Sequence, residues 1–123
     1  MKLSDSLVCF IEERLYRYCK QLSINKPTVL TKTREVLDLP KKVTKGRRTS
    51  AYRYYGVAYM AYNTVFINVK RNKTRKDLDH TIRHELIHMR FPYLSHGSNF
   101  EKKISLLGKG HTWKPSKSKY LDN

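Results

Sequence analysis

The sequence contains few residues that form disulfides or break helices and strands, with two cysteines, four prolines and five glycines among 123 residues. It has one tryptophan. Its two cysteines, Cys9 and Cys19, form neither a CxxC pair nor part of an even ladder of four or more. This pattern excludes a cysteine zinc ribbon and a disulfide scaffold. We expect two reduced thiols that pack on one helix.

Long apolar runs are also absent. The longest stretch without a charged residue, positions 54–69, is shorter than the ~18 apolar residues of a membrane span, and Gly56 and Asn63 interrupt it. The first apolar run, positions 7–11, is very short and stands between acidic residues, unlike the core of a secretory signal. We therefore expect a cytoplasmic, intracellular protein without a membrane partner.

Acidic residues are scarce: ten Asp and Glu stand against 26 Lys and Arg, which gives a formal net charge of +16. An excess of this size favours a polyanionic partner, and DNA bound without sequence specificity is the expectation because no base-reading module is recognisable. For each basic cluster alone, a solvated loop is as good an interpretation as a phosphate contact. The candidate nucleic-acid-binding residues are Lys41, Lys42, Lys45, Arg47, Arg48, Lys70, Arg71, Lys73, Arg75 and Lys76.

The chain is rich enough in bulky side chains to fold, with 39% hydrophobic and 11% aromatic residues. Its length predicts one domain at positions 1–110, followed by a basic, mobile tail at 111–123. Apolar residues at three- and four-residue steps predict a helix over 4–22. A β-branched segment at 28–33 predicts a strand, and turn-forming residues predict an exposed loop over 38–50.

The middle of the chain predicts a hairpin and a capped helix. Aromatic and β-branched residues at 52–60 and 64–70 flank a short link, which is typical of two antiparallel strands. Thr74, with an acid three residues later, fits a helix N-cap, and Pro92 prevents that helix from continuing. A further helix is predicted from Ser98. We expect an α+β fold with an N-terminal helix, a small three-stranded, mostly antiparallel sheet, and two later helices.

The helix after Thr74 carries His84, Glu85 and His88 in the spacing HExxH. Residues four apart lie on one helical face, about 6 Å apart along the axis, so both imidazoles can bind one Zn²⁺ at ~2.0–2.1 Å. Zinc lowers the pKa of a bound water toward ~7, and Glu85 can take its proton as the water attacks a carbonyl. The motif therefore predicts peptide hydrolysis. His80 can also pair with His84, but only the His84/His88 pair carries the Glu, so we place His80 outside the ligand set.

A catalytic zinc site needs a third protein ligand and one open position. The candidates are His96, Glu101 and His111. His96 lies just past Pro92, where a turn can fold back toward the first two histidines. Glu101 lies one turn inside the next helix and can orient a ligand instead of binding the metal. His111 lies in the tail, where an unliganded side chain is the simpler interpretation.

The HExxH sequence is followed, after seven residues, by a second short motif at positions 96–100, HGSNF. This combination resembles the SprT-like family of zinc metalloproteases, which includes Spartan and the WLM-type proteases. In that family a histidine of HGxxF completes the zinc site and its phenylalanine packs beneath it. The resemblance implies zinc ligation by His84, His88 and His96, general-base catalysis by Glu85, and a supporting role for Phe100.

The resemblance extends upstream of the motif helix. The tripeptides at 56–58 (GVA) and 66–68 (FIN) stand where the family has a G-x-A strand and an I-x-I-type strand. It covers positions 7–107 and implies a minimal zincin core. Family members that carry a Cys-rich ribbon have it after this core, and here no cysteine follows Cys19.

Two hypotheses from different classes follow, with a third that the sequence does not separate from the first. The first is a zinc-dependent endopeptidase that acts on proteins at or near nucleic acid, with its peptide substrate added along the sheet edge. The alternative is a basic nucleic-acid-binding protein on the same scaffold, with a structural metal or a silent protease. The third is a small toxin or host-interaction factor with the same hydrolytic site. Tyr93 and His111 are possible oxyanion donors, and nothing in the spacing selects them.

Overall fold

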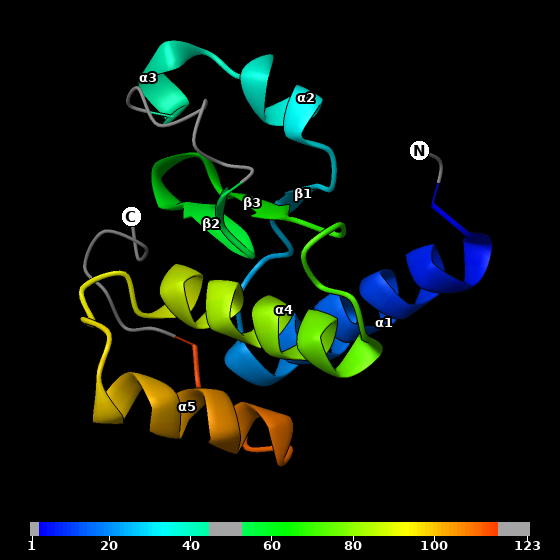
Figure 1. Ribbon diagram of the computed structural model, residues 1–123. Helices are drawn as coiled ribbons and strands as arrows, with labels where there is room; N and C mark the ends of the chain where they lie inside the picture. Colours follow the sequence, from blue (N-terminus) through cyan, green and yellow to red (C-terminus); the bar gives the residue numbers. More distant parts are fainter. Residues whose placement is uncertain (1–2, 45–52, 116–123) are drawn as a thin grey trace.

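The structure, a computed structural model, describes residues 3–44 and 53–115. They form an α+β fold, which confirms the predicted class (Figure 1). In chain order the elements are α1 (Asp5–Leu22), β1 (Thr28–Leu30), α2 (Thr33–Leu37), α3 (Lys41–Thr44), β2 (Gly56–Tyr59), the 3-10 turn η2 (Met60–Tyr62), β3 (Thr64–Ile67), α4 (Arg75–Arg90) and α5 (Ser98–Gly108).

Helix α1 begins and ends where its sequence predicts. The Ser4 hydroxyl accepts a hydrogen bond from the Leu7 amide at 3.2 Å and caps the N-terminus. Ser23 adopts a left-handed conformation (φ 56°) at the other end, where its amide bonds the last carbonyls of the helix. The buried face of α1 consists of Ile11, Leu15, Tyr18, Cys19 and Leu22.

The sheet has the strand order β1-β3-β2. The hairpin is confirmed: β2 pairs antiparallel with β3, and Asn63 turns the chain between them with a left-handed φ of 46°. Strand β1 instead pairs parallel with β3, so the sheet is mixed rather than mostly antiparallel. The cause is the long connection after β1, because the chain first forms the far strand β2 and then returns as β3 in the direction of β1.

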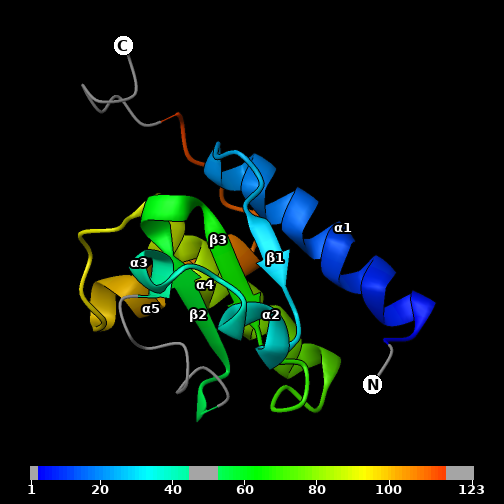
Figure 2. The same ribbon diagram turned by 90° about the horizontal axis from the view of Figure 1, so that it is seen from above.

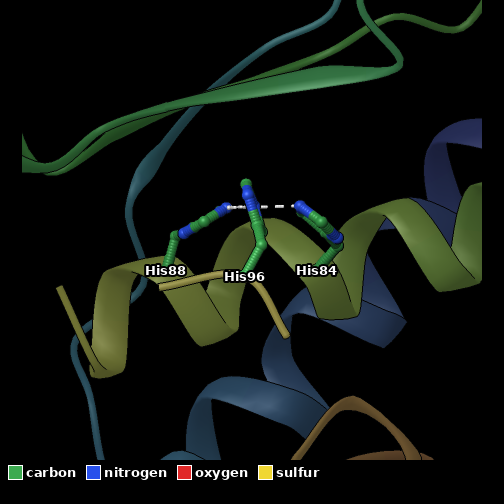
Figure 3. A group of neighbouring side chains, drawn as sticks. All are labelled: His84, His88 and His96. Atoms are coloured by element: carbon green, nitrogen blue, oxygen red, sulfur yellow. Dashed lines mark hydrogen bonds between the residues drawn. The ribbon is translucent and has the colours of Figure 1, made fainter. Parts of the chain in front are cut away.

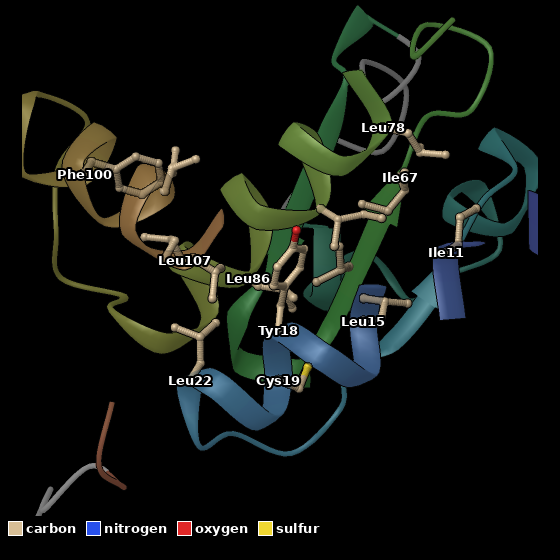
Figure 4. Packing of buried hydrophobic residues seen from close by; sticks show 14 residues of the cluster. Ile11, Leu15, Tyr18, Cys19, Leu22, Ile67, Leu78, Leu86, Phe100 and Leu107 are labelled. Atoms are coloured by element: carbon tan, nitrogen blue, oxygen red, sulfur yellow. The ribbon is translucent and has the colours of Figure 1, made fainter. Parts of the chain in front are cut away.

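Alternate residues of β3 separate two layers of apolar packing. Val65 and Ile67 face the main core with α1, α4 and α5, as their alternation predicts, whereas Phe66 faces the opposite layer with Val36 of α2. Figures 1 and 2 show this arrangement, with α2 and α3 on one face of the sheet and α4 beneath the other. Figure 4 shows side chains of the main core, in which α1, α4 and α5 meet.

Helices α2 and α3 were not predicted, because their segment contains turn formers and lacks a long apolar period. The Glu35 carboxylate accepts hydrogen bonds from the Thr31 and Lys32 amides at 3.2 and 3.0 Å, and this contact holds the start of α2. Val36 is fully buried and packs with Phe66 on the face of the sheet opposite α4. The expected exposed loop at 38–50 therefore contains a short helix in its described part, and positions 45–50 lie outside the described residues.

Helix α4 is capped as predicted, since the Thr74 hydroxyl accepts from the Asp77 amide at 3.0 Å. It ends at Arg90, two residues before Pro92. Arg83 and Asp79 make three contacts on a half-buried flank of this helix. Arg83 pairs with Asp79 at 3.0 Å and donates to the Ile104 carbonyl of α5 at 2.8 Å, and Tyr18 of α1 donates to Asp79 at 2.6 Å. The helix is thereby fixed against both α1 and α5.

The segment just after α5, which is the first part of the expected basic tail at 111–123, packs on the domain. The Trp113 amide donates to the Gln21 carbonyl at 2.7 Å, and the Ser23 hydroxyl donates to the Trp113 carbonyl at 2.6 Å. The indole ring also packs on the main core. Tryptophan overrides the polar composition of this segment because its ring buries a large apolar area. Positions 116–123 of the expected tail lie outside the described residues.

Among the helices of the described ranges, none is both long and apolar enough to cross a membrane.

Candidate metal centre

Three imidazoles converge above α4. His84 and His88 lie one turn apart on this helix, and His96 comes from the loop that joins α4 to α5. The Nε2 atom of His88 lies 3.2 Å from Nε2 of His84 and 2.9 Å from Nε2 of His96. Figure 3 shows the three rings rising from the helix and loop toward the sheet, with their nitrogens directed at one another.

The separations of these nitrogens suit one metal ion. Two ligand atoms of a tetrahedral ion with bonds of ~2.0–2.1 Å lie ~3.3 Å apart. The candidate ligand atoms of His84, His88 and His96 all lie within 4.8 Å of one another. Among the residues that the structure describes, these three are the one set of at least three His, Cys, Asp or Glu side chains whose ligand atoms lie this close together. The three predicted ligands are therefore brought together in a geometry that can hold a metal.

Burial and mutual repulsion keep two of these imidazoles neutral. Burial, then the neighbouring His84 and His96, lowers the pKa of His88 to about 4. The pKa of His84 is also lowered, by burial first and then by His96 and His80. Neutral imidazole is the form that binds metal ions. At neutral pH His84 and His88 consequently present nitrogen lone pairs without first losing protons.

Phe100 of α5 forms the floor of the cluster. Its ring centroid lies 4.8 Å from that of His84, 4.5 Å from that of His88 and 4.9 Å from that of His96. The Phe100 side chain is fully buried, so it fixes the rings from below. Gly97 precedes α5 with φ 153° and ψ −163°, a conformation essentially restricted to glycine. The turn at Gly97 therefore lets the chain place His96 of the loop above the cluster and Phe100 of α5 below it.

Glu85 lies on the side of α4 that faces β2. Its side chain is buried, and burial raises its pKa to about 8. A Cβ added at Gly56 would lie 2.9 Å from Glu85 Oε2 and 2.9 Å from the Phe66 carbonyl oxygen. Only glycine at this position of β2 leaves room for the carboxyl group. A cation held by the neighbouring imidazoles would lower the pKa of Glu85, because opposite charge stabilises the carboxylate.

A buried network of hydrogen bonds joins α4 to the segment before β2. The Thr81 hydroxyl donates to Asn72 Oδ1 at 2.6 Å, and Asn72 Nδ2 donates to the carbonyls of Tyr55 at 3.0 Å and Asn68 at 2.8 Å. Asn68 Nδ2 donates in turn to the Tyr54 carbonyl at 2.9 Å. Thr81 lies one turn before the buried carboxyl group of the motif. The network therefore sets the position of that group relative to the start of β2.

The other candidate ligands lie outside the cluster. His80 is exposed, and its ring centroid lies 6.4 Å from that of His84. Glu101 is exposed, and its negative charge slightly opposes the lowering of the His84 pKa. His111 stacks edge-on against Trp113, with centroids 4.5 Å apart, and is not part of the triad. Tyr93, a possible oxyanion donor, is 93% exposed. His80 and His111 therefore lie apart from the three converging imidazoles.

A pocket of about 820 Å³ adjoins the cluster, and His84 and Glu85 form part of its wall. It lies between the segment that leads into β2, the loop from β3 to α4, and the exposed side of α4. We name this space the α4 pocket. It is lined by Arg53, Tyr54, Tyr55, Gly56, Arg71, Asn72, Lys73, Asp77, His80, Thr81, His84, Glu85 and Glu101.

The predicted nucleic-acid residues fall into two sets. Lys70, Arg71, Lys73, Arg75 and Lys76 are all exposed around the loop from β3 to α4. Arg75 is also engaged within the domain, since its guanidinium donates to the Ser6 hydroxyl at 2.8 Å and stacks over Phe10. In the other set Lys41 and Lys42 are exposed, and the remaining three, Lys45, Arg47 and Arg48, lie outside the described residues.

Sequence reasoning missed Gly56 as the residue that accommodates Glu85, and it missed the roles of Asn72 and Thr81. The only signal for Asn72 and Thr81 is their type, because small polar side chains beside apolar residues are buried only when they find partners.

The chain matches no protein-family model, and no characterised protein or solved structure shows significant similarity to it.

Proposed function

We propose that this protein is a zinc-dependent endopeptidase. The observation that carries the proposal is the convergence of three imidazole nitrogens within 4.8 Å of one another, one residue along the chain from the buried carboxyl group of Glu85. Three imidazoles and an open fourth position are a ligand set of catalytic zinc sites. A purely structural zinc site has four protein ligands, and the described residues supply three here.

Zinc, when bound, supplies a Lewis acid that polarises a carbonyl and lowers the pKa of water toward ~7. The chain's own residues do the rest. Glu85 accepts a proton from the attacking water on its carboxylate and later returns it to the amine of the leaving peptide. Gly56 leaves space for this carboxyl group, and Phe100 holds the imidazoles in place.

The sheet presents a binding edge to the substrate. Strand β2 is the outer neighbour of β3 in the described sheet and starts at Gly56, directly beside Glu85. An extended peptide that adds to this edge gains main-chain hydrogen bonds and passes over the imidazoles. Such binding recognises unfolded or extended segments with little regard to most side chains. It suits an endopeptidase.

We also place the substrates at or near nucleic acid inside the cell. The exposed cations around the loop from β3 to α4, together with a net charge of +16, support binding to phosphates without base specificity. The same observation favours the second candidate, a nucleic-acid-binding protein with a structural metal or a silent protease. The two candidates differ in what Glu85 does.

The experiment compares wild type with Glu85→Gln after zinc loading. We expect equal zinc content and similar thermal stability in both proteins, with cleavage of an unfolded casein only by wild type. The amide keeps the shape of the side chain and accepts no proton at neutral pH. Cleavage by both proteins would show that Glu85 is not the base. Absence of cleavage by wild type at full zinc occupancy, with and without single-stranded DNA, would favour the second candidate.

A further inference from the structure

The α4 pocket has an uneven distribution of charge. Its cations, Arg53, Arg71 and Lys73, come from the segment before β2 and from the loop from β3 to α4, and all three are exposed. Its exposed carboxylates, Asp77 and Glu101, come from α4 and α5. The pocket is therefore positive on its sheet side and negative on its helix side.

The position of the pocket connects it with the candidate reaction site. Gly56, the first residue of the edge strand, lines the pocket together with Glu85 and His84. A peptide added along β2 directs alternate side chains to opposite faces of the extended sheet. A side chain close to the bond that lies over the imidazoles is thereby brought to the mouth of the pocket.

From this juxtaposition we propose that the α4 pocket is a specificity subsite for an acidic side chain, Asp or Glu, of the peptide substrate. The proposal rests on the proposed peptidase function. The carboxylate of the substrate pairs with Arg71, Lys73 and Arg53 on the sheet side, where a guanidinium can hold it through two hydrogen bonds. Two exposed tyrosines, Tyr54 and Tyr55, supply the apolar wall for its methylene groups.

A peptide fits this pocket better than a nucleic acid does. A single carboxylate can sit against the cations and stay away from Asp77 and Glu101. A run of phosphates that filled the pocket would pass both carboxylates, and like charges in close contact are repelled. The phosphate-binding proposal therefore concerns the outer surface of the same loop, whereas the pocket itself selects one acidic side chain.

The first experiment measures cleavage preference. Fluorescence-quenched peptides carry Glu, Gln or Lys at each position on either side of the cleaved bond. We expect Glu to exceed Gln by at least about tenfold in kcat/KM at one position, with Lys disfavoured there. The double variant Arg71→Glu and Lys73→Glu should reverse this order. The matched control, Lys20→Glu and Lys109→Glu, makes the same change of net charge outside the pocket and should retain the preference.

The second experiment does not require cleavage. Zinc-loaded Glu85→Gln protein is titrated with labelled Glu and Gln versions of one peptide and with a labelled 20-nucleotide oligothymidine. Tighter binding of the Glu peptide, lost in the pocket variant and kept in the control, supports the subsite even if wild type cleaves nothing, in which case only the peptidase proposal fails. Lys73→Gln, with folding checked by circular dichroism, should reduce the discrimination if the double variant does not fold.

Two results overturn the subsite. Equal binding and equal cleavage of the Glu and Gln peptides would remove it while leaving the peptidase proposal intact. Binding of oligothymidine that the pocket variant loses and the control keeps, without discrimination between peptides, would assign these cations to nucleic acid.

Discussion

The two faces of α4 differ in the chemical type of the side chains that they bury. The face toward α1 and α5 carries Leu78, Ile82 and Leu86, which are almost completely buried and have no polar atoms in their side chains. The face toward β2 carries the imidazoles and the Glu85 carboxyl group, which is buried and has a raised pKa. Burial of an ionisable group costs stability, so the first face stabilises the fold through its packing and the second face carries the proposed chemistry at some cost in stability.

Replacement of Leu86 by Ala should have the largest effect on stability. Its side chain is fully buried in the main core, and loss of its methyl groups leaves a cavity. We expect a loss of ~2–5 kcal/mol in the free energy of unfolding, measured by urea denaturation. For Glu85→Gln on the polar face we expect the reverse result, in which cleavage is abolished and the free energy of unfolding is nearly unchanged. Equal destabilisation by both changes would erase the distinction between the faces.

Gly56→Ala tests the close approach of β2 to the polar face. The new Cβ meets the Phe66 carbonyl oxygen at 2.9 Å, and this backbone atom cannot move aside as a flexible side chain would. We expect a loss of ~1–3 kcal/mol, typical of overpacking, in chemical denaturation. Cleavage should fall more than stability alone explains, since Glu85 Oε2 is displaced too. An alanine variant with wild-type stability and activity would contradict this packing.

Thr81→Val removes one hydroxyl from the network that positions α4. Asn72 Oδ1 then loses its donor at 2.6 Å in a buried place, for which we expect a cost of ~1–3 kcal/mol. Thr81→Ser keeps the hydroxyl and is the matched control, with the smaller loss of a methyl group. If valine proves no worse than serine in thermal unfolding, the hydrogen bond does not contribute.

The thiol of Cys19 should have the smallest effect on stability, and its reactivity tests whether the buried face of α1 in the main core excludes solvent. Burial raises the pKa of this thiol to about 11, and Cys9 is exposed. We expect iodoacetamide at pH 8 to alkylate Cys9 quickly and Cys19 only after unfolding, as read by peptide mass spectrometry. The folded pKa exceeds the usual value near ~8.5, so the unfolded chain loses the proton first. Stability from this group is thus present below that value and is lost as pH rises toward 11. Rapid alkylation of both thiols would contradict the burial.

The limits of α4 and the placing of His84 and His88 on one face could be predicted because both are local. Thr74 and Pro92 mark the helix through capping and the missing amide, and HExxH places two imidazoles on one face. The resemblance of the later HGxxF motif to the SprT-like pattern implied His96, and the structure brings this residue to the other two. The zinc ion, the peptidase activity and the nucleic-acid partner stay proposals.

The features that could not be predicted depend on contacts between distant segments. Pairing of β1 with β3 follows from the path of the intervening chain, which periodicity does not record. The packing of Trp113 on α1 was hidden by the polar composition around it. The contact of Gly56 with Glu85 joins residues from β2 and α4, so the sequence of either element alone does not predict it.

The zinc content of two histidine variants tests the central claim, that the polar face of α4 and its following loop form a metal centre. Wild type, His96→Ala and His80→Ala are loaded with zinc, dialysed and measured by mass spectrometry of the metal. Both variants lose one imidazole near His84, and only His96 directs its nitrogen into the cluster. The account predicts one equivalent of zinc in wild type and His80→Ala and a sharp loss in His96→Ala. Zinc retained by His96→Ala and lost by His80→Ala would contradict it.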